Sequence, residues 1–104
     1  MTKETKENLS PYLEDVSEGQ KFWASDGCTF KNISELVDSL KKMSMETFES
    51  HVNHEKNDFA KWIYDVIGDT KLAGILNTIT DKKETEKKIK SRISSIKRKI
   101  KIKI

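Results

Sequence analysis

Two histidines and one aspartate are the residues whose types and spacing could support metal binding or acid–base chemistry. His51, His54 and Asp58 are separated by three and four residues, so one continuous helix would place all three on one face. Transition metals favour such imidazole and carboxylate ligands. However, Asn53 and Asn57 favour a break between two helices, and no usual fourth ligand lies nearby. We therefore expect no metal and no cofactor, and favour a structural role in which His51 hydrogen-bonds a helix end.

The single cysteine, Cys28, is the only thiol that could act as a nucleophile. It would need a histidine base aligned with it in space, and a half-buried strand cysteine is the more common case. A lone cysteine also cannot form an internal disulfide. The four glycines form no phosphate-binding pattern. These observations predict a protein that is not an enzyme.

A basic C-terminal segment is the strongest functional signal. Residues 81–104 contain 11 Lys and Arg and 3 Asp and Glu, a net charge of +8, whereas residues 1–80 carry a net charge of −5. A basic segment of this kind binds phosphates without base preference, because phosphate neutralisation releases counterions. We predict a non-enzymatic binding module that contacts the DNA or RNA backbone. The predicted contact residues are Lys87, Lys88, Lys90, Arg92, Lys97, Arg98 and Lys99.

Four isoleucines in the same segment support an alternative function. Ile89, Ile93, Ile96 and Ile100 fall within an arc of about 60° on a helix, which resembles a heptad seam. This seam could bind another protein or a second copy of the chain. A solvated lysine-rich tail and a helix lying on an anionic membrane are further interpretations.

The remaining pattern predicts no membrane-spanning segment. No stretch approaches the roughly 18 apolar residues that a membrane span needs. No signal peptide is visible at the N-terminus, so we expect a cytoplasmic location.

The elements around these residues predict a mainly α fold, as a compact bundle of short helices with a small β-hairpin and a basic C-terminal helix. The Asp26-Gly27 turn lies between Phe22 and Phe30 and predicts strands near residues 21–24 and 28–30. Apolar residues at helical spacing follow capping residues at five places. The predicted caps are Asn32, Ser44, Asn57 or Asp58, Asp69 and Asp81.

The length of 104 residues fits one domain, which we divide into three parts. Residues 1–20 form a polar segment in which Leu9, Tyr12, Leu13 and Val16 would suit one face of a short helix. Residues 21–79 form the helical core with the hairpin. Residues 80–104 form the basic helix or arm, whose helix we expect to fray or end after Lys99, where the apolar period changes to two.

The stretch from residue 48 to residue 76 contains a motif of the form H-V-N, a short gap, N-D-F, a W-I pair, a G-D step and L-A. Through this motif the stretch resembles a family of small uncharacterised helical domains in archaeal and bacterial proteins. An upstream aromatic, a D-G turn and an E-L helix extend the resemblance to about residues 21–79, without the basic arm. The resemblance implies no activity, and we expect structural roles for its motif residues. These residues are His51, Asn53, Asn57, Asp58 and Trp62.

Overall fold

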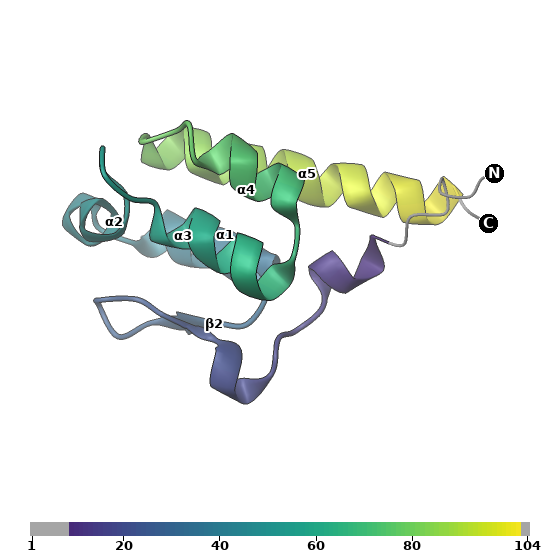
Figure 1. Ribbon diagram of the computed structural model, residues 1–104, viewed down its shortest axis with the longest axis horizontal. Coiled ribbons are helices and arrows are strands. Elements are labelled where there is room, and N and C mark those ends of the chain that lie inside the picture. The colour runs from purple at the N-terminus through teal and green to yellow at the C-terminus, as the bar shows by residue number, and fades with distance from the viewer. Residues whose placement is uncertain (1–8, 103–104) are drawn as a thin grey trace.

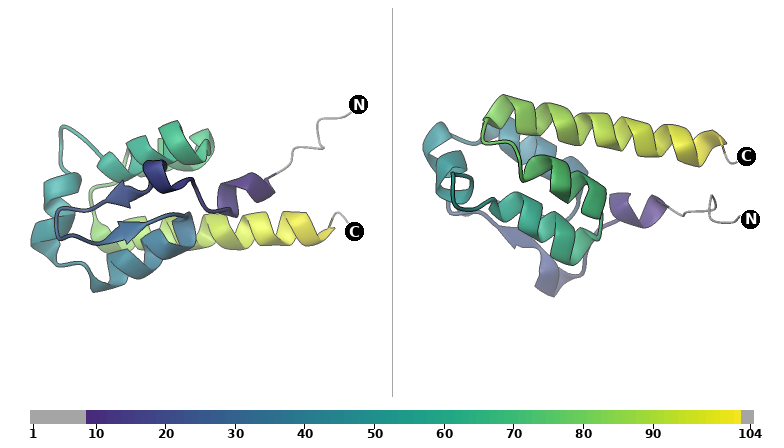
Figure 2. Two further views of the ribbon diagram at one scale, coloured as in Figure 1. Left: turned by 90° about the horizontal axis from the view of Figure 1, so that it is seen from below. Right: turned by 45° about the horizontal axis from the view of Figure 1, so that its top comes forward.

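The computed structural model describes residues 9–102, with side chains to residue 100, and it confirms a mainly α fold with one small hairpin (Figure 1). The elements in chain order are η2 (Ser10–Leu13), η3 (Glu18–Gln20), β1 (Phe22–Trp23), β2 (Thr29–Phe30), α1 (Ile33–Lys42), α2 (Met45–His51), α3 (Asp58–Trp62), η4 (Ile63–Ile67), α4 (Thr70–Leu76) and α5 (Lys82–Ile102). Both η2 and η3 are 3₁₀ turns, and η4 is a π-helical turn. Figure 2 shows α5 running along one edge of the molecule, beside the shorter helices.

The hairpin forms around the predicted Asp-Gly turn. Strands β1 and β2 pair antiparallel, with Phe22 opposite Phe30, and these two rings stack with their centroids 4.8 Å apart. Gly27 has a φ of +92°, a backbone conformation that L-residues other than glycine rarely adopt. The Asp26 carboxylate accepts the Cys28 amide at 2.9 Å and fixes the turn. The hairpin is therefore specified locally, and its aromatic face packs on the helices.

Short polar side chains begin five helices at the positions that the sequence predicts. Each accepts a backbone N–H that has no partner inside its helix. The pairs are Asn32 with Glu35, Ser44 with Thr47, Asn57 with Ala60, Asp69 with Leu72, and Asp81 with Glu84. Helix α3 continues directly into η4, and Gly68, with a φ of +90°, terminates this combined helix at its C-terminal end.

Two helices differ from the sequence prediction. The helix expected up to Gly68 changes at Ile63 into a π turn, in which the Gly68 amide donates to the Ile63 carbonyl at 2.7 Å. Apolar spacing cannot separate the two forms here, because both place Ile63 and Ile67 on the core side. The last helix was expected to fray or end after Lys99, but α5 continues to Ile102. A helix satisfies its own backbone groups there, whereas a single strand would need a partner.

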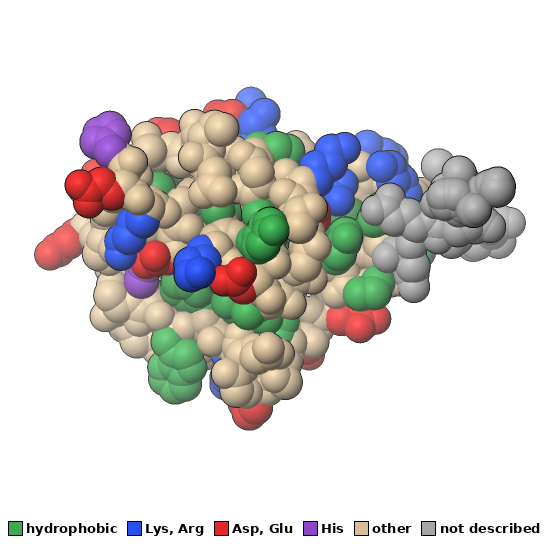
Figure 3. All heavy atoms as spheres, in the orientation of Figure 1, with side chains coloured by type: hydrophobic (Ala, Val, Ile, Leu, Met, Phe, Trp, Pro, Cys, Tyr) green, Lys and Arg blue, Asp and Glu red, His purple; other side chains and the backbone are tan. Residues whose placement is uncertain are grey.

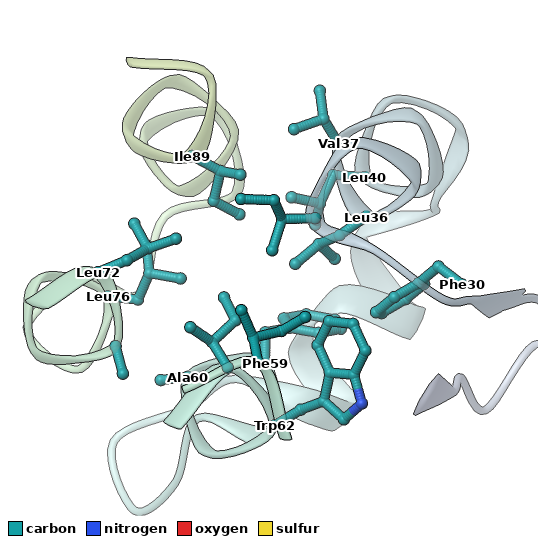
Figure 4. Packing of buried hydrophobic residues seen from close by; sticks show 14 of the residues in the cluster. Phe30, Leu36, Val37, Leu40, Phe59, Ala60, Trp62, Leu72, Leu76 and Ile89 are labelled. Carbon is teal, nitrogen blue, oxygen red and sulfur yellow. The ribbon is translucent and has the colours of Figure 1, made fainter. Parts of the chain in front are cut away.

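The hydrophobic core lies between α1, α3, α4 and α5 (Figure 4). Ile89 extends from α5 towards Leu36 and Leu40 of α1 and towards Leu72 of α4. Ile89 is fully buried, and so is Ile96 further along the seam. The first half of the basic helix therefore belongs to the core, which extends beyond the predicted range of 21–79.

The N-terminal segment also packs on this core. Leu9 is buried, and Tyr12, Leu13 and Val16 are half-buried against the core cluster. The expected short helix is the 3₁₀ turn η2, and the Val16 amide donates to a carbonyl between β2 and α1 at 2.7 Å. The parts of the predicted terminal segments at residues 1–8 and 103–104 lie outside the described residues.

Candidate nucleic-acid interface

Helix α5 presents two chemically different sides. Its inner side packs on α1 and α4 and carries the fully buried Thr85, Ile89 and Ile96. On part of its outer side, polar residues border a shallow hollow, and we call this part the basic face. The basic face consists of Lys83, Glu86, Lys87, Lys90, Ser91, Ser94 and Arg98. Figure 3 shows Lys and Arg side chains gathered along the edge that α5 occupies.

Few of the exposed cations on α5 form an ion pair with a described carboxylate. Lys90 lies 3.6 Å from Glu86, and Lys88 lies 3.9 Å from Glu84. Ion pairs at the protein surface contribute about 0–1 kcal/mol to stability, so another anion can readily replace the carboxylate. The other exposed cations of α5 make no salt bridge with any residue whose side chain is described. They are Lys83, Lys87, Lys97, Arg98 and Lys99.

Arg92 differs from the other predicted contact residues. Its Nε donates to Asp69 Oδ2 at 2.7 Å and its Nη2 donates to Asp69 Oδ1 at 3.0 Å. The Asp69 side chain is 1% exposed and that of Arg92 is 10% exposed. The Tyr12 ring centroid lies 6.0 Å from the guanidinium carbon. Arg92 therefore ties α5 to the start of α4, and we remove it from the predicted nucleic-acid contacts.

The isoleucine seam faces the interior of the chain. Ile89 and Ile96 are fully buried, and Ile93 is half-buried against the core. Ile100 is half-buried as well. The seam is thus used within the chain and offers no continuous apolar strip to a second chain. A heptad pattern cannot reveal this, because it is the same whether the buried partner is internal or external.

His51 connects the hairpin to two helices. Its Nε2 accepts the Ser25 amide at 3.0 Å, and its Nδ1 lies 2.9 Å from Asp58 Oδ2. Because Nε2 is an acceptor here, the neutral ring carries its proton on Nδ1 and donates it to the carboxylate. We expected His51 to bond a helix end, whereas the amide that it accepts belongs to the hairpin turn.

The other motif residues also make structural contacts. Asn57 caps α3 with its Oδ1, and its Nδ2 donates to the Leu76 carbonyl at 2.9 Å. Asn53 accepts an amide of its own loop at 2.9 Å. Trp62 is 7% exposed, and its Nε1 donates to the Gln20 carbonyl at 2.9 Å. The Asn57 bond holds the loop between α2 and α3 against α4, and the Trp62 bond holds α3 against the segment before β1.

The structure brings together His51 and Asp58 but adds no third ligand to them from the described residues. His54 is exposed, and residues 9–100 contain no group of three or more His, Cys, Asp or Glu that could hold a metal ion. Cys28 is exposed, and the Asp26 carboxylate raises the pKa of its thiol by hydrogen bonding and by charge repulsion of the thiolate. An activated cysteine nucleophile has the opposite shift.

Lys83 is the cation of the basic face that the sequence prediction missed. It lies four residues before Lys87, so the two side chains share one side of a helix. That spacing was the available signal. The sequence prediction omitted Lys83 because it included only cations from Lys87 onwards, where they are more frequent.

No family model, curated protein or solved structure matches this chain. The family resemblance over residues 21–79 therefore stays a prediction, and the case for the basic face rests on its own geometry. Within residues 9–102, no helix combines the length and apolar content needed to cross a bilayer.

Proposed function

We propose that this protein is a non-enzymatic module that binds the phosphate backbone of nucleic acid through the basic face of α5. The observation that carries the proposal is the exposure of Lys83, Lys87, Lys90 and Arg98 on one side of a single helix. Only Lys90 among them pairs with a carboxylate whose side chain is described. The charge is also concentrated, since residues 1–80 carry a net charge of −5.

The attachment of α5 to the core supports this function over that of a solvated tail. Ile89, Ile96 and the Arg92–Asp69 ion pair fix the inner side of the helix. The cations therefore extend from a helix that is already ordered. Binding then costs less conformational entropy than it would for an unfolded lysine-rich tail.

An anionic membrane surface is the strongest competing partner. An interfacial helix inserts its apolar side between lipids. The apolar side of α5 is occupied by α1 and α4, so the helix offers a lipid surface only its charges. Cosedimentation with anionic vesicles tests this alternative. Binding to vesicles together with no binding to nucleic acid would overturn the proposal.

The decisive experiment compares two triple variants of the full chain that lose the same charge. Lys87→Ala, Lys90→Ala and Arg98→Ala remove cations from the basic face. Lys41→Ala, Lys42→Ala and Lys71→Ala remove exposed cations that lie outside it. Alanine preserves helix formation at all six positions.

We expect the basic-face variant alone to lose affinity for a short labelled nucleic acid. The negative slope of its plot of log affinity against log salt should decrease in magnitude by about 2–3, because each lost phosphate contact contributes about 0.7–0.9 to that slope. Fluorescence anisotropy over a salt series measures this slope. Equal losses in the two variants would show that net charge, and not the basic face, controls binding.

A further inference from the structure

We infer that the preferred partner is B-form double-stranded DNA, with α5 lying in the major groove. The inference rests on the proposed function and names the class of nucleic acid that the same face would bind. Three features of α5 lead to it: its exposure as a rod at the edge of the molecule, the placement of its cations around the axis, and the absence of aromatic side chains.

The first feature is the shape of the exposed helix. The outer side of α5 is covered by none of the other described elements, and it lies at the edge of the molecule (Figures 1 and 2). From Lys83 to Arg98 the basic face extends about 22 Å, at about 1.5 Å per residue. A helix with side chains is about 10–12 Å across, and the B-DNA major groove is about 12 Å wide. The exposed rod therefore has the dimensions of a groove-binding helix.

The second feature is the distribution of cations around the helix axis. At about 100° per residue, Lys90 and Lys97 lie at one margin of the outer side, while Lys88 and Lys99 lie at the other, about 160–200° away. A helix in a groove has a phosphate strand on each side. Cations at both margins can contact both strands, whereas one phosphate chain would use one margin only.

The middle of the basic face carries small hydroxyl side chains. Ser91 and Ser94 are exposed and lie between Lys87 and Arg98. Short side chains at this position allow the helix backbone to approach the groove floor closely. Serine hydroxyls both donate and accept, so they contact any base pair without strong selection.

The third feature is the lack of a stacking surface on α5. Proteins bind single strands by stacking bases on exposed aromatic side chains. Residues 82–102 contain no Phe, Tyr or Trp. The exposed aromatic residues of the described chain are Trp23 and Tyr64, which belong to the hairpin and to η4 and do not line the basic face. Double-stranded RNA is disfavoured as well, because its deep, narrow major groove does not admit a helix.

The test measures the affinity of the full chain for three labelled nucleic acids of one sequence: duplex DNA, single-stranded DNA and duplex RNA. Duplexes of about 20 base pairs exceed the roughly 7 that the basic face spans at about 3.4 Å per base pair. We expect duplex DNA to bind at least about tenfold more tightly than the other two. Equal affinities, or tighter binding of single-stranded DNA or RNA, would overturn this inference while leaving backbone binding intact. No binding of any of the three at low salt would instead refute the proposed function itself.

A charge-neutral variant tests insertion into the groove directly. The double substitution Ser91→Gln and Ser94→Gln lengthens the side chains in the middle of the basic face and keeps every cation. We expect duplex affinity to fall severalfold and affinity for single-stranded DNA to remain the same. Ser34→Gln, at an exposed position of α1, is the matched control. Unchanged duplex affinity in the double variant would show that α5 does not enter the groove.

Discussion

Arg92 and Arg98 are the only arginines of the chain, and they lie six residues apart on the same helix in opposite surroundings. Arg92 makes two hydrogen bonds with the buried carboxylate of Asp69. Arg98 is exposed and makes no salt bridge with a described residue. Six residues turn a helix by about 240° beyond a full rotation, which moves a side chain from the core side to the solvent side. Position around the axis, and not residue type, therefore separates folding from binding on α5.

The two sides of α5 make this difference measurable. Substitutions on the inner side should lower the free energy of unfolding, and substitutions on the basic face should leave it nearly unchanged. Three sets of substitutions on α5 test this separation, and a fourth extends it to the two histidines, in order of decreasing effect on stability.

Arg92→Ala should have the largest effect. It leaves the buried Asp69 carboxylate without its positive partner, and breaking a buried pair in this way costs about 3–5 kcal/mol. Urea denaturation monitored by circular dichroism measures the loss. Arg98→Ala is the matched control and should change stability by no more than about 0.5 kcal/mol. Similar losses in the two variants would abolish the distinction between the two sides.

Ile96→Ala should have the next largest effect. Ile96 is fully buried, and truncation of such a side chain costs about 2–5 kcal/mol. Ile100→Ala, at a half-buried position of the same seam, should cost less. Thermal unfolding of both variants provides the comparison. If Ile96→Ala instead left the melting temperature unchanged and altered the sedimentation profile, the seam would bind a second chain.

The two histidines extend the comparison beyond α5, because one is bonded on both ring nitrogens and the other is exposed. His51→Ala should cost about 1–3 kcal/mol, since it leaves the Ser25 amide and the Asp58 carboxylate without a partner. His54→Ala should have little effect on stability. Nitrogen chemical shifts should also show the proton of neutral His51 on Nδ1. A proton on Nε2 would contradict the bond from Ser25.

The triple variant of the basic face should have the smallest effect on folding. Lys87, Lys90 and Arg98 are exposed, and together their replacement by Ala should alter the free energy of unfolding by no more than about 0.5 kcal/mol. Urea denaturation measures this change beside the binding assay. A large loss of stability would mean that the outer side also supports the fold, and the binding result could then not be assigned to the lost cations.

The features that the sequence predicts correctly are those that depend on near neighbours. The five helix caps and the Asp26-Gly27 turn each bond to residues within three positions. Their side chains therefore indicate the local structure directly.

The features that the sequence does not reveal depend on distant partners. Asp69 and Arg92 are 23 residues apart, so Arg92 could not be distinguished from the exposed cations around it. The isoleucine pattern likewise indicates that these side chains are buried, but it does not show which surface they pack against. For the candidate site, the cation-rich helix was predictable, whereas the division of its cations between two sides required the fold.

The Asp69 carboxylate has a consequence for how the protein opens. Besides bonding Arg92, its Oδ1 accepts the Leu72 amide at 3.1 Å and so begins α4. Detaching α5 would leave this buried acid without its countercharge, and the first turn of α4 would lose its anchored cap. We therefore expect the amide hydrogens at the start of α4 and in the middle of α5 to exchange with solvent together, as one cooperative unit.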